Sequence, residues 1–203
     1  MSRFARGHQE AGDHLDALAG ALDGLRADLP RLELWGRRLA AVLSGGGRLL
    51  AAGNGGSAAQ AAHLTSELVG RYRDDRPPFS AIALCAESAA VTAIGNDYGP
   101  EEVFARQVRA HGRPGDVLVA LSTSGLSPNV LAAVEAAVSV GMSTWALCGP
   151  RDAPLACGCD DAICVDAAET ATVQEVHLIA LHLLCAAFDR AIARGGASLE
   201  VAS

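Results

Sequence analysis

Lysine is absent from this chain, and all sixteen basic residues among its 203 are arginines. That absence excludes enzymes that form a Schiff base on a lysine, hold pyridoxal phosphate through one, or bind nucleotides with a P-loop lysine. Positive charge is also scarce, because twenty-three acidic residues leave a net charge of −7 and a pI near 5.3. We therefore expect no nucleic-acid partner, since neutralising phosphates needs a basic face.

Aromatic residues make up only 4% of the sequence, although half of it is hydrophobic. The core must therefore consist mainly of Ala, Leu, Val and Ile, in a globular protein. No uninterrupted apolar run reaches the roughly 20 residues that cross a bilayer, and the N-terminus lacks the apolar segment of a signal peptide. The sequence thus predicts a cytoplasmic protein with no membrane partner.

No Cys-x-x-Cys pair occurs, although the chain has six cysteines. Cys157 and Cys159, separated by one glycine, could bind a metal or act as a redox pair. Several cysteines lie in apolar segments, and in a reducing compartment buried structural thiols are the preferred interpretation. The six are Cys85, Cys148, Cys157, Cys159, Cys164 and Cys185.

Short apolar runs alternate with amphipathic segments along most of the chain. Residues from about Gly7 to Leu43 have leucines at helical spacing, and Pro30 predicts either a break between two helices or a bend. The predicted strands are Arg48–Ala52, Ser80–Leu84, Asp116–Leu121, Ser143–Cys148 and Asp161–Val165. The predicted helices after the N-terminal pair are Ser57–Val69, Ser88–Ile94, Glu101–Ala110, Pro128–Val140 and Thr172–Arg194. Strands that are apolar on both faces and separated by helices indicate an α/β fold with a parallel sheet covered on both sides.

The loop GNGGSA at 53–58 follows the first predicted strand and begins a helix. Its three glycines let backbone N–H groups approach a ligand closely. The loop also fits the G-x-G-x-x-A form of a dinucleotide fingerprint, but the acidic residues about 20 positions on, Asp74 and Asp75, do not end a strand. A ligand-binding turn is favoured here, with a plain glycine-rich turn as the alternative.

A second loop, after the strand that ends at Leu121, has hydroxyl side chains at four of six positions. They belong to Ser122, Thr123, Ser124 and Ser127, and the next helix begins at Pro128. An ordinary helix cap needs one hydroxyl, not four. Hydroxyls and free helix N–H groups can hold a phosphate monoester without a cation, so this loop predicts a phosphate site.

Four polar residues on two predicted helices could form one catalytic or metal site. His63 and Glu67 are four residues apart and share a helix face. Gln174 and His182 lie on an apolar helix, where polar groups are costly unless satisfied; a buried histidine is the ordinary alternative. The two are about 12 Å apart on a straight helix, so a shared small centre would require fraying near Gln174 or a site between subunits. His177 points elsewhere and is expected to be structural.

Several motifs, in the same order, carry a family resemblance: GNGGSAAQAAHLTSELVGR, TAIGNDYG, FARQV, RPGDVL, LSTSG-SPNVL and TATVQEVHLIALHLLC, from about Gly45 to Cys185. They resemble bacterial phosphoheptose isomerases of the sugar-isomerase (SIS) family. The resemblance implies a three-layer α/β/α sandwich with a five-stranded parallel sheet and an N-terminal helical extension. It also implies a homotetramer with active sites between subunits, a bound zinc ion, and conversion of sedoheptulose 7-phosphate to D-glycero-D-manno-heptose 7-phosphate. We expect residues 1–44 to pack on the domain or an oligomer partner, 45–195 to form the SIS domain and 196–203 a tail.

The same resemblance assigns roles to individual residues. Substrate contacts fall to Asn54, Gly55, Gly56, Glu67, Asn96, Asp97 and Gln174, with Ser122, Thr123, Ser124 and Ser127 around the phosphate. Zinc ligands would be His63, Glu67, Gln174 and His182, and the acid/base pair would be Glu67 and His182. Two positions depart from the family pattern: Leu126 stands where Asn is usual and Thr172 where Arg is common. Both departures could change which sugar phosphate fits.

Moving a proton between C1 and C2 of an aldose or ketose needs a base, a proton donor for the oxygens and stabilisation of the enediolate. Glu67 and His182 could share the first two roles in either order. If Glu67 is both ligand and base, metal binding competes with catalysis. The alternatives are a non-catalytic SIS relative that binds a replication initiator, a sugar-phosphate sensor and, more distantly, a nucleotide-dependent dehydrogenase. The first lacks residues matching Glu67 and His182, and the second carries a helix-turn-helix that the N-terminus does not resemble.

Overall fold

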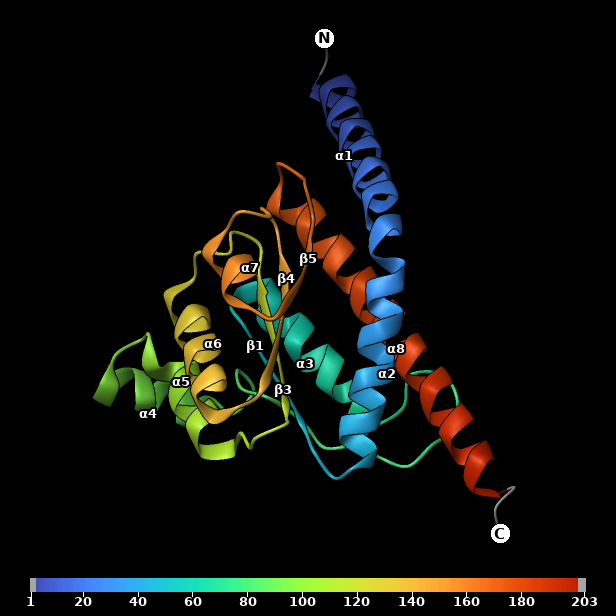
Figure 1. The fold of residues 1–203 in the computed structure, drawn as a ribbon. Helices are drawn as coiled ribbons and strands as arrows, with labels where there is room; N and C mark the ends of the chain where they lie inside the picture. Colours follow the sequence, from blue (N-terminus) through green and yellow to red (C-terminus); the bar gives the residue numbers. More distant parts are fainter. Residues whose placement is uncertain (1–2, 201–203) are drawn as a thin grey trace.

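The computed structural model describes residues 3–200, with side chains from 7 to 195, so 1–2 and 201–203 of the predicted terminal segments lie outside the described residues. At its centre is a five-stranded sheet in the order β2-β1-β3-β4-β5, with every neighbouring pair parallel (Figure 1). The strands are β1 Leu49–Gly53, β2 Ala81–Ala83, β3 Val117–Ser122, β4 Ser143–Cys148 and β5 Asp161–Cys164. Each of the five predicted strands is confirmed to within one residue at either end.

Eight α-helices occur among the described residues. They are α1 Arg3–Leu25, α2 Leu29–Ser44, α3 Gly55–Val69, α4 Ser88–Tyr98, α5 Glu102–His111, α6 Pro128–Val140, α7 Pro154–Gly158 and α8 Thr170–Glu200. Pro30 lies in the first turn of α2, after a short 3-10 turn at Arg26–Asp28, which confirms the predicted break. Helix α4 was predicted to end at Ile94 but continues through Gly95 until Gly99, whose φ of +92° ends it. Helix α7 was not predicted, because five residues are too few to show a period.

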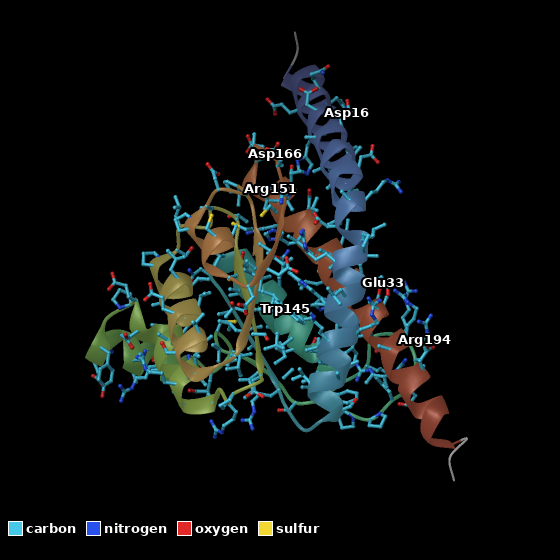
Figure 2. All side chains as sticks on the ribbon, in the orientation of Figure 1. Asp16, Glu33, Trp145, Arg151, Asp166 and Arg194 are labelled. Atoms are coloured by element: carbon cyan, nitrogen blue, oxygen red, sulfur yellow. The ribbon has the colours of Figure 1, made fainter. Side chains whose placement is uncertain are left out.

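Helices cover both faces of the sheet, so the predicted three-layer α/β/α sandwich is confirmed (Figure 1). One core lies between the sheet and helices α2, α3 and α8, and a second lies between the sheet and α5, α6 and α7. Successive β1 residues alternate between them, with Leu49 in the first core and Leu50 in the second. The only two tryptophans, Trp35 of α2 and Trp145 of β4, stack with centroids 4.9 Å apart in the interior (Figure 2).

Helix α8 meets the length and composition of a membrane span between Thr170 and Gly195. Polar residues such as His182 interrupt it, so no uninterrupted apolar run corresponds to it. Its apolar side chains, among them Val176, Leu184 and Phe188, are buried in the core with residues of α2 and α3. These contacts place α8 directly against α3.

The strand order reverses between β1 and β3. From β1 the chain continues outward to β2, whereas from β3 it continues in the other direction to β4 and β5. Ligands of open parallel sheets bind beyond the carboxyl ends of the strands at such a reversal. The glycine-rich loop after β1 and the hydroxyl-rich loop after β3 both lie there.

Candidate active site

The two loops are joined by a pair of side-chain amides. Asn54, which precedes α3, donates from Nδ2 to Oδ1 of Asn129 (2.8 Å), and Asn129 donates back to Oδ1 of Asn54 (2.9 Å). Asn129 is the second residue of α6. The N-termini of α3 and α6 therefore open side by side, and their unpaired N–H groups favour an anion at this point.

Ser122, the buried last residue of β3, organises the hydroxyl-rich loop. Its Oγ lies 3.1 Å from Oγ of Ser127 and 3.4 Å from Oγ of Ser124, and it accepts a hydrogen bond from the backbone N–H of Gly125 (3.0 Å). Gly125 has a φ of +66°, which favours glycine there. Thr123 is half-buried beside them. Three clustered hydroxyls at a helix N-terminus form a cradle for a phosphate monoester, although the loop contains no arginine.

Helices α3 and α8 bring a carboxylate and two imidazoles together. Nε2 of His63 lies 2.9 Å from Nε2 of His182 and 3.4 Å from Oε1 of Glu67. The three ligand atoms all lie within 4.8 Å of one another, and the three side chains are half-buried. Residues 119 positions apart in sequence thus meet within one chain. This trio requires no second subunit.

The trio fits a divalent metal by its donor set. Two imidazole nitrogens and a carboxylate oxygen are ligands that zinc uses, and catalytic sites keep a further position open. Zinc–nitrogen bonds of about 2.0–2.1 Å at a tetrahedral angle separate the two nitrogens by about 3.4 Å, so His63 and His182 need to move apart only slightly. The chain therefore has a His/Glu/His cluster that can hold a metal ion.

Gln174 lies at a different level of the α3–α8 interface. Gln60 donates from Nε2 to its backbone carbonyl (2.6 Å), and a Cβ on Gly56 would stand 2.5 Å from its Oε1. Glycine at 56 therefore makes room for the Gln174 amide. Helix α8 begins at Thr170 and is continuous here, so no fraying carries Gln174 toward His182. Polar side chains therefore lie at two separate places along the α3–α8 interface: Gln174 near the loops, and His63 with Glu67 farther along α3.

Asn96 and Asp97 are not brought to this site within one chain. Both are exposed in the last turn of α4, which lies on the other side of the sheet from α3 and α8 (Figure 1). Among the hydrogen bonds of the described residues, none connects them to either loop. Of the two family departures, Leu126 is 60% exposed at the hydroxyl-rich loop, whereas Thr172 is fully buried and its hydroxyl has no partner among the described residues.

Tyr72 and Arg76, which follow α3, contribute to the site although no sequence pattern singled them out. The Tyr72 ring lies 5.6 Å from the His182 ring, tilted by 31°, and covers it on one side. Arg76 is almost completely buried and donates to the backbone carbonyl of Glu67 (2.6 Å). Both residues lie in a polar stretch that the sequence predicts to be a loop. Only the family motif that ends at the neighbouring Arg71 pointed to this part of the chain.

His177 has the expected structural role. It is fully buried, and its Nε2 lies 3.1 Å from the backbone carbonyl of Cys148 at the end of β4. Burial lowers the pKa of His177 to about 4, although the hydrogen bond to Cys148 opposes the shift. The side chain is therefore neutral at pH 7 and donates its Nε2 proton to that carbonyl.

We expect His177 to make the protein sensitive to acid. In the unfolded chain it binds a proton below pH 6.5, whereas in the folded protein it does so only near pH 4, so stability falls as the pH falls between these values. The free energy of unfolding should be about 2 kcal/mol lower at pH 5 than at pH 7 because of this residue. His177→Gln keeps an N–H donor and cannot titrate. Urea unfolding at both pH values should show a smaller difference for the variant, and equal differences would contradict the assignment.

Comparisons with known proteins agree with the geometry. Residues 17–149 match the family model of the SIS domain. The phosphoheptose isomerase of Streptomyces coelicolor is 63% identical over 188 residues, which cover 93% of this chain and 81% of that protein. The phosphoheptose isomerase of Thiobacillus denitrificans is 47% identical over 186 residues, 90% of this chain and 94% of that protein. The solved structure of a phosphoheptose isomerase from Francisella tularensis superposes with a TM-score of 0.83 at 33% identity, covering 94% of this chain and all of that one.

Proposed function

The chain belongs to the SIS domain family and, within it, to the phosphoheptose isomerases, and from this membership we propose that it converts sedoheptulose 7-phosphate to D-glycero-D-manno-heptose 7-phosphate. The observation that carries the proposal is the meeting of Glu67 with His63 and His182 at the α3–α8 interface, with the N-terminus of α3 next to the hydroxyl-rich loop. A sugar-phosphate sensor or a non-catalytic binding protein has no need of such a trio.

The site is arranged to suit a substrate that reacts at one end and is held at the other. The phosphate is on C7, and the reaction takes place at C1 and C2. Ser122, Ser124 and Ser127 would hold the phosphate, with Thr123 beside them, while Asn54, Gly55 and Gly56 line the neighbouring loop. Glu67 lies in the last turns of α3, well removed from that loop. Gln174, beside Gly56, would contact the sugar between the two ends.

The chemistry is a pair of proton transfers. In the ketose-to-aldose direction a base removes a proton from C1 and returns it to C2. At the same time O1 loses its proton and O2 gains one. The Glu67 carboxylate can exchange the carbon-bound proton, and the His182 imidazole can carry a proton between the two oxygens, or the roles can be reversed. Tyr72 covers the His182 ring and limits its contact with water.

A zinc ion would be held by His63, Glu67 and His182. When bound, it supplies a Lewis acid for the carbonyl oxygen of the substrate. Gln174 would be the fourth ligand that the family resemblance assigns, and its amide over Gly56 would also contact the substrate. In a metal-bound enzyme His182 and Glu67 hold the ion, so proton transfer and metal binding compete for the same side chains.

We also propose that the protein acts in the cytoplasm as a homo-oligomer, with four copies as in the family resemblance. Helix α4 supports an oligomer, since it is rich in apolar residues and none of its residues is buried within one chain. Leu15 of α1, 64% exposed, adds a second uncovered apolar position. Another copy that covers α4 could also bring Asn96 and Asp97 into contact with substrate.

The direct test is to incubate the purified full-length protein with sedoheptulose 7-phosphate and follow the aldose product by NMR. We expect turnover, and the effect of a chelator shows which role the metal has: a loss that Zn²⁺ restores indicates a Lewis acid, and a gain indicates competition for Glu67 and His182. Unchanged activity after verified metal removal would support the proposed isomerase function and exclude a role for the metal in catalysis. Binding of the sugar phosphate without any turnover would contradict the proposed function and favour a sensor.

A further inference from the structure

Four of the six cysteines lie on β4, on β5 or in the connection between them, two of them at the carboxyl end of these strands. Cys148 and Cys164 are the last residues of β4 and β5, and they are register partners in the parallel pairing of these strands. Cys157 is in α7 and Cys159 directly follows it, and α7 packs across both strands. All four are free thiols. Figure 2 labels Arg151, which lies in the connection between β4 and α7 at this end of the sheet.

The geometry selects one pair from this cluster. Neighbouring strands lie about 4.8 Å apart, so register partners fall inside the range of about 4.4–6.8 Å between Cα atoms that a disulfide requires. Cys148 and Cys164 both belong to the core on the α6–α7 face, so their side chains are on the same side of the sheet. Cys148 is fully buried, whereas Cys164 is half-buried and accessible to a small oxidant.

Burial dominates the electrostatics of both thiols. Burial, and next the neighbouring Cys164, raise the pKa of Cys148 to about 11. Burial also raises the pKa of Cys164, and the Arg151 guanidinium opposes that rise. The pair does not form a metal site with the other cysteines: among the described residues only the trio of His63, Glu67 and His182 converges closely enough. Without a metal site, the cysteines here are structural thiols or take part in redox chemistry.

Cys148 also supports the hydroxyl-rich loop. A Cβ on Gly125 would stand 2.7 Å from Sγ of Cys148, so the sulfur packs directly against this glycine. The backbone carbonyl of Gly125 accepts a hydrogen bond from the N–H of Leu155 in α7 (3.2 Å). The Sγ of Cys148 donates to the carbonyl of Pro150 (3.5 Å). Moving this sulfur therefore removes a contact beneath Gly125, whose N–H is bonded to Ser122.

We propose that Cys148 and Cys164 are a site of reversible oxidation, in which hydrogen peroxide forms a disulfide that weakens phosphate binding at the neighbouring loop. The small fraction of Cys164 present as thiolate, which the Arg151 guanidinium favours, attacks peroxide and becomes a sulfenic acid, releasing hydroxide. The Cys148 sulfur then attacks the sulfenic sulfur, and the hydroxyl group leaves as water. In sum, two thiols and one peroxide give one disulfide and two waters. To bond Cys164, the Cys148 sulfur must leave Gly125, and a reducing thiol reverses the change.

The site of oxidation can be mapped without any activity measurement. Full-length protein is treated with peroxide, alkylated and digested with a protease that cleaves before aspartate. Cuts at Asp116, Asp152 and Asp161 put Cys148 on one peptide, Cys157 with Cys159 on a second and Cys164 on a third. We expect the first and third peptides to be cross-linked, with the loss of two hydrogens, and to separate on reduction.

Two variants make the result decisive. Cys164→Ser should abolish the cross-link, whereas Cys157→Ser, which removes the exposed thiol, should retain it. Three results would each contradict the assignment of the disulfide to Cys148 and Cys164. They are a cross-link to the 152–159 peptide, loss of the cross-link in Cys157→Ser, and oxidation of Cys148 and Cys164 to sulfinic acid alone.

The effect on the loop rests on the proposed function and is tested separately with inorganic phosphate as the probe. We expect phosphate binding to weaken by about fivefold in the oxidised protein, as for the loss of one loop hydrogen bond, and to recover on reduction. Cys164→Ser should keep its phosphate affinity after peroxide treatment. A mapped disulfide with unchanged affinity would overturn the coupling to the loop. Phosphate that fails to bind even the reduced protein would count against the proposed phosphate site itself, not against the disulfide.

Discussion

Replacing Glu67 by Gln is expected to lower kcat for isomerisation by about 10²–10⁴-fold, the usual contribution of a general acid or base. Gln keeps the size of the side chain and loses its ability to accept a carbon-bound proton. The carboxylate is only 17% exposed and lies 3.4 Å from His63, so no other acidic side chain within the trio can replace it. Glu135→Gln, on the exposed face of α6, is the matched control and should leave kcat unchanged.

His182→Gln should cause a loss of similar size, because it removes the imidazole that faces His63 and Tyr72. Thermal unfolding and circular dichroism of each variant should match the parent protein, since both side chains are only partly buried. Zn²⁺ titration separates two explanations: a variant that still binds zinc but is inactive has lost proton transfer, not the metal. A double variant with full activity would refute both roles.

The fold was predictable because it depends on patterns that are short in sequence. Each strand is a run of apolar residues bounded by polar ones, and Ser143–Cys148 and Pro128–Val140 agree with the structure to the residue. The hydroxyl-rich loop was predictable for the same reason, since its serines are neighbours in sequence. Helix α7 was missed because a helix of five residues shows no period.

What the sequence could not predict depends on contacts between distant segments. The pairing of Cys148 with Cys164 follows from the register of β4 and β5, which no local pattern specifies. The placement of Gln174 over Gly56 follows from how α8 lies along α3. The sequence suggested a shared site for Glu67 and His182 and the family resemblance favoured it, but helical spacing left the distance between the two helices open.

Arg76 is the clearest case of a residue that only the structure reveals. Its guanidinium donates to the backbone carbonyls of Glu67 (2.6 Å) and Leu68 (3.1 Å) at the end of α3, and pairs with Asp189 of α8 (2.8 Å). It also lies over the rings of Phe79 and Phe188, 5.4 and 5.2 Å from their centroids. The last carbonyls of a helix have no partner within the helix. Arg76 supplies one, and it ties the turn that carries Glu67 to the helix that carries His182.

Arg76→Ala should therefore reduce the free energy of unfolding by about 3–5 kcal/mol, as expected when one member of a buried ion pair is removed. Urea unfolding measures the loss. Arg109→Ala is the matched control, because that arginine is about half exposed and pairs with Glu102 on the surface; it should change stability by less than about 1 kcal/mol. A variant at position 76 as stable as the parent would contradict this role.

Because Arg76 also donates to backbone carbonyls of α3, removing Arg76 and removing Asp189 should not destabilise the protein equally. Asp189→Ala removes one acceptor but leaves Arg76 bonded to the end of α3, whereas Arg76→Ala leaves both the carbonyls and the buried Asp189 carboxylate without their donor. We therefore expect the arginine variant to be the less stable of the two. Replacing both residues with leucine, which often restores the stability lost from a buried ion pair, should fail here because the α3 carbonyls stay unsatisfied. Arg76→Lys should recover only part of the loss, since an ammonium group cannot reproduce the guanidinium's planar set of donors to the carboxylate and the carbonyls.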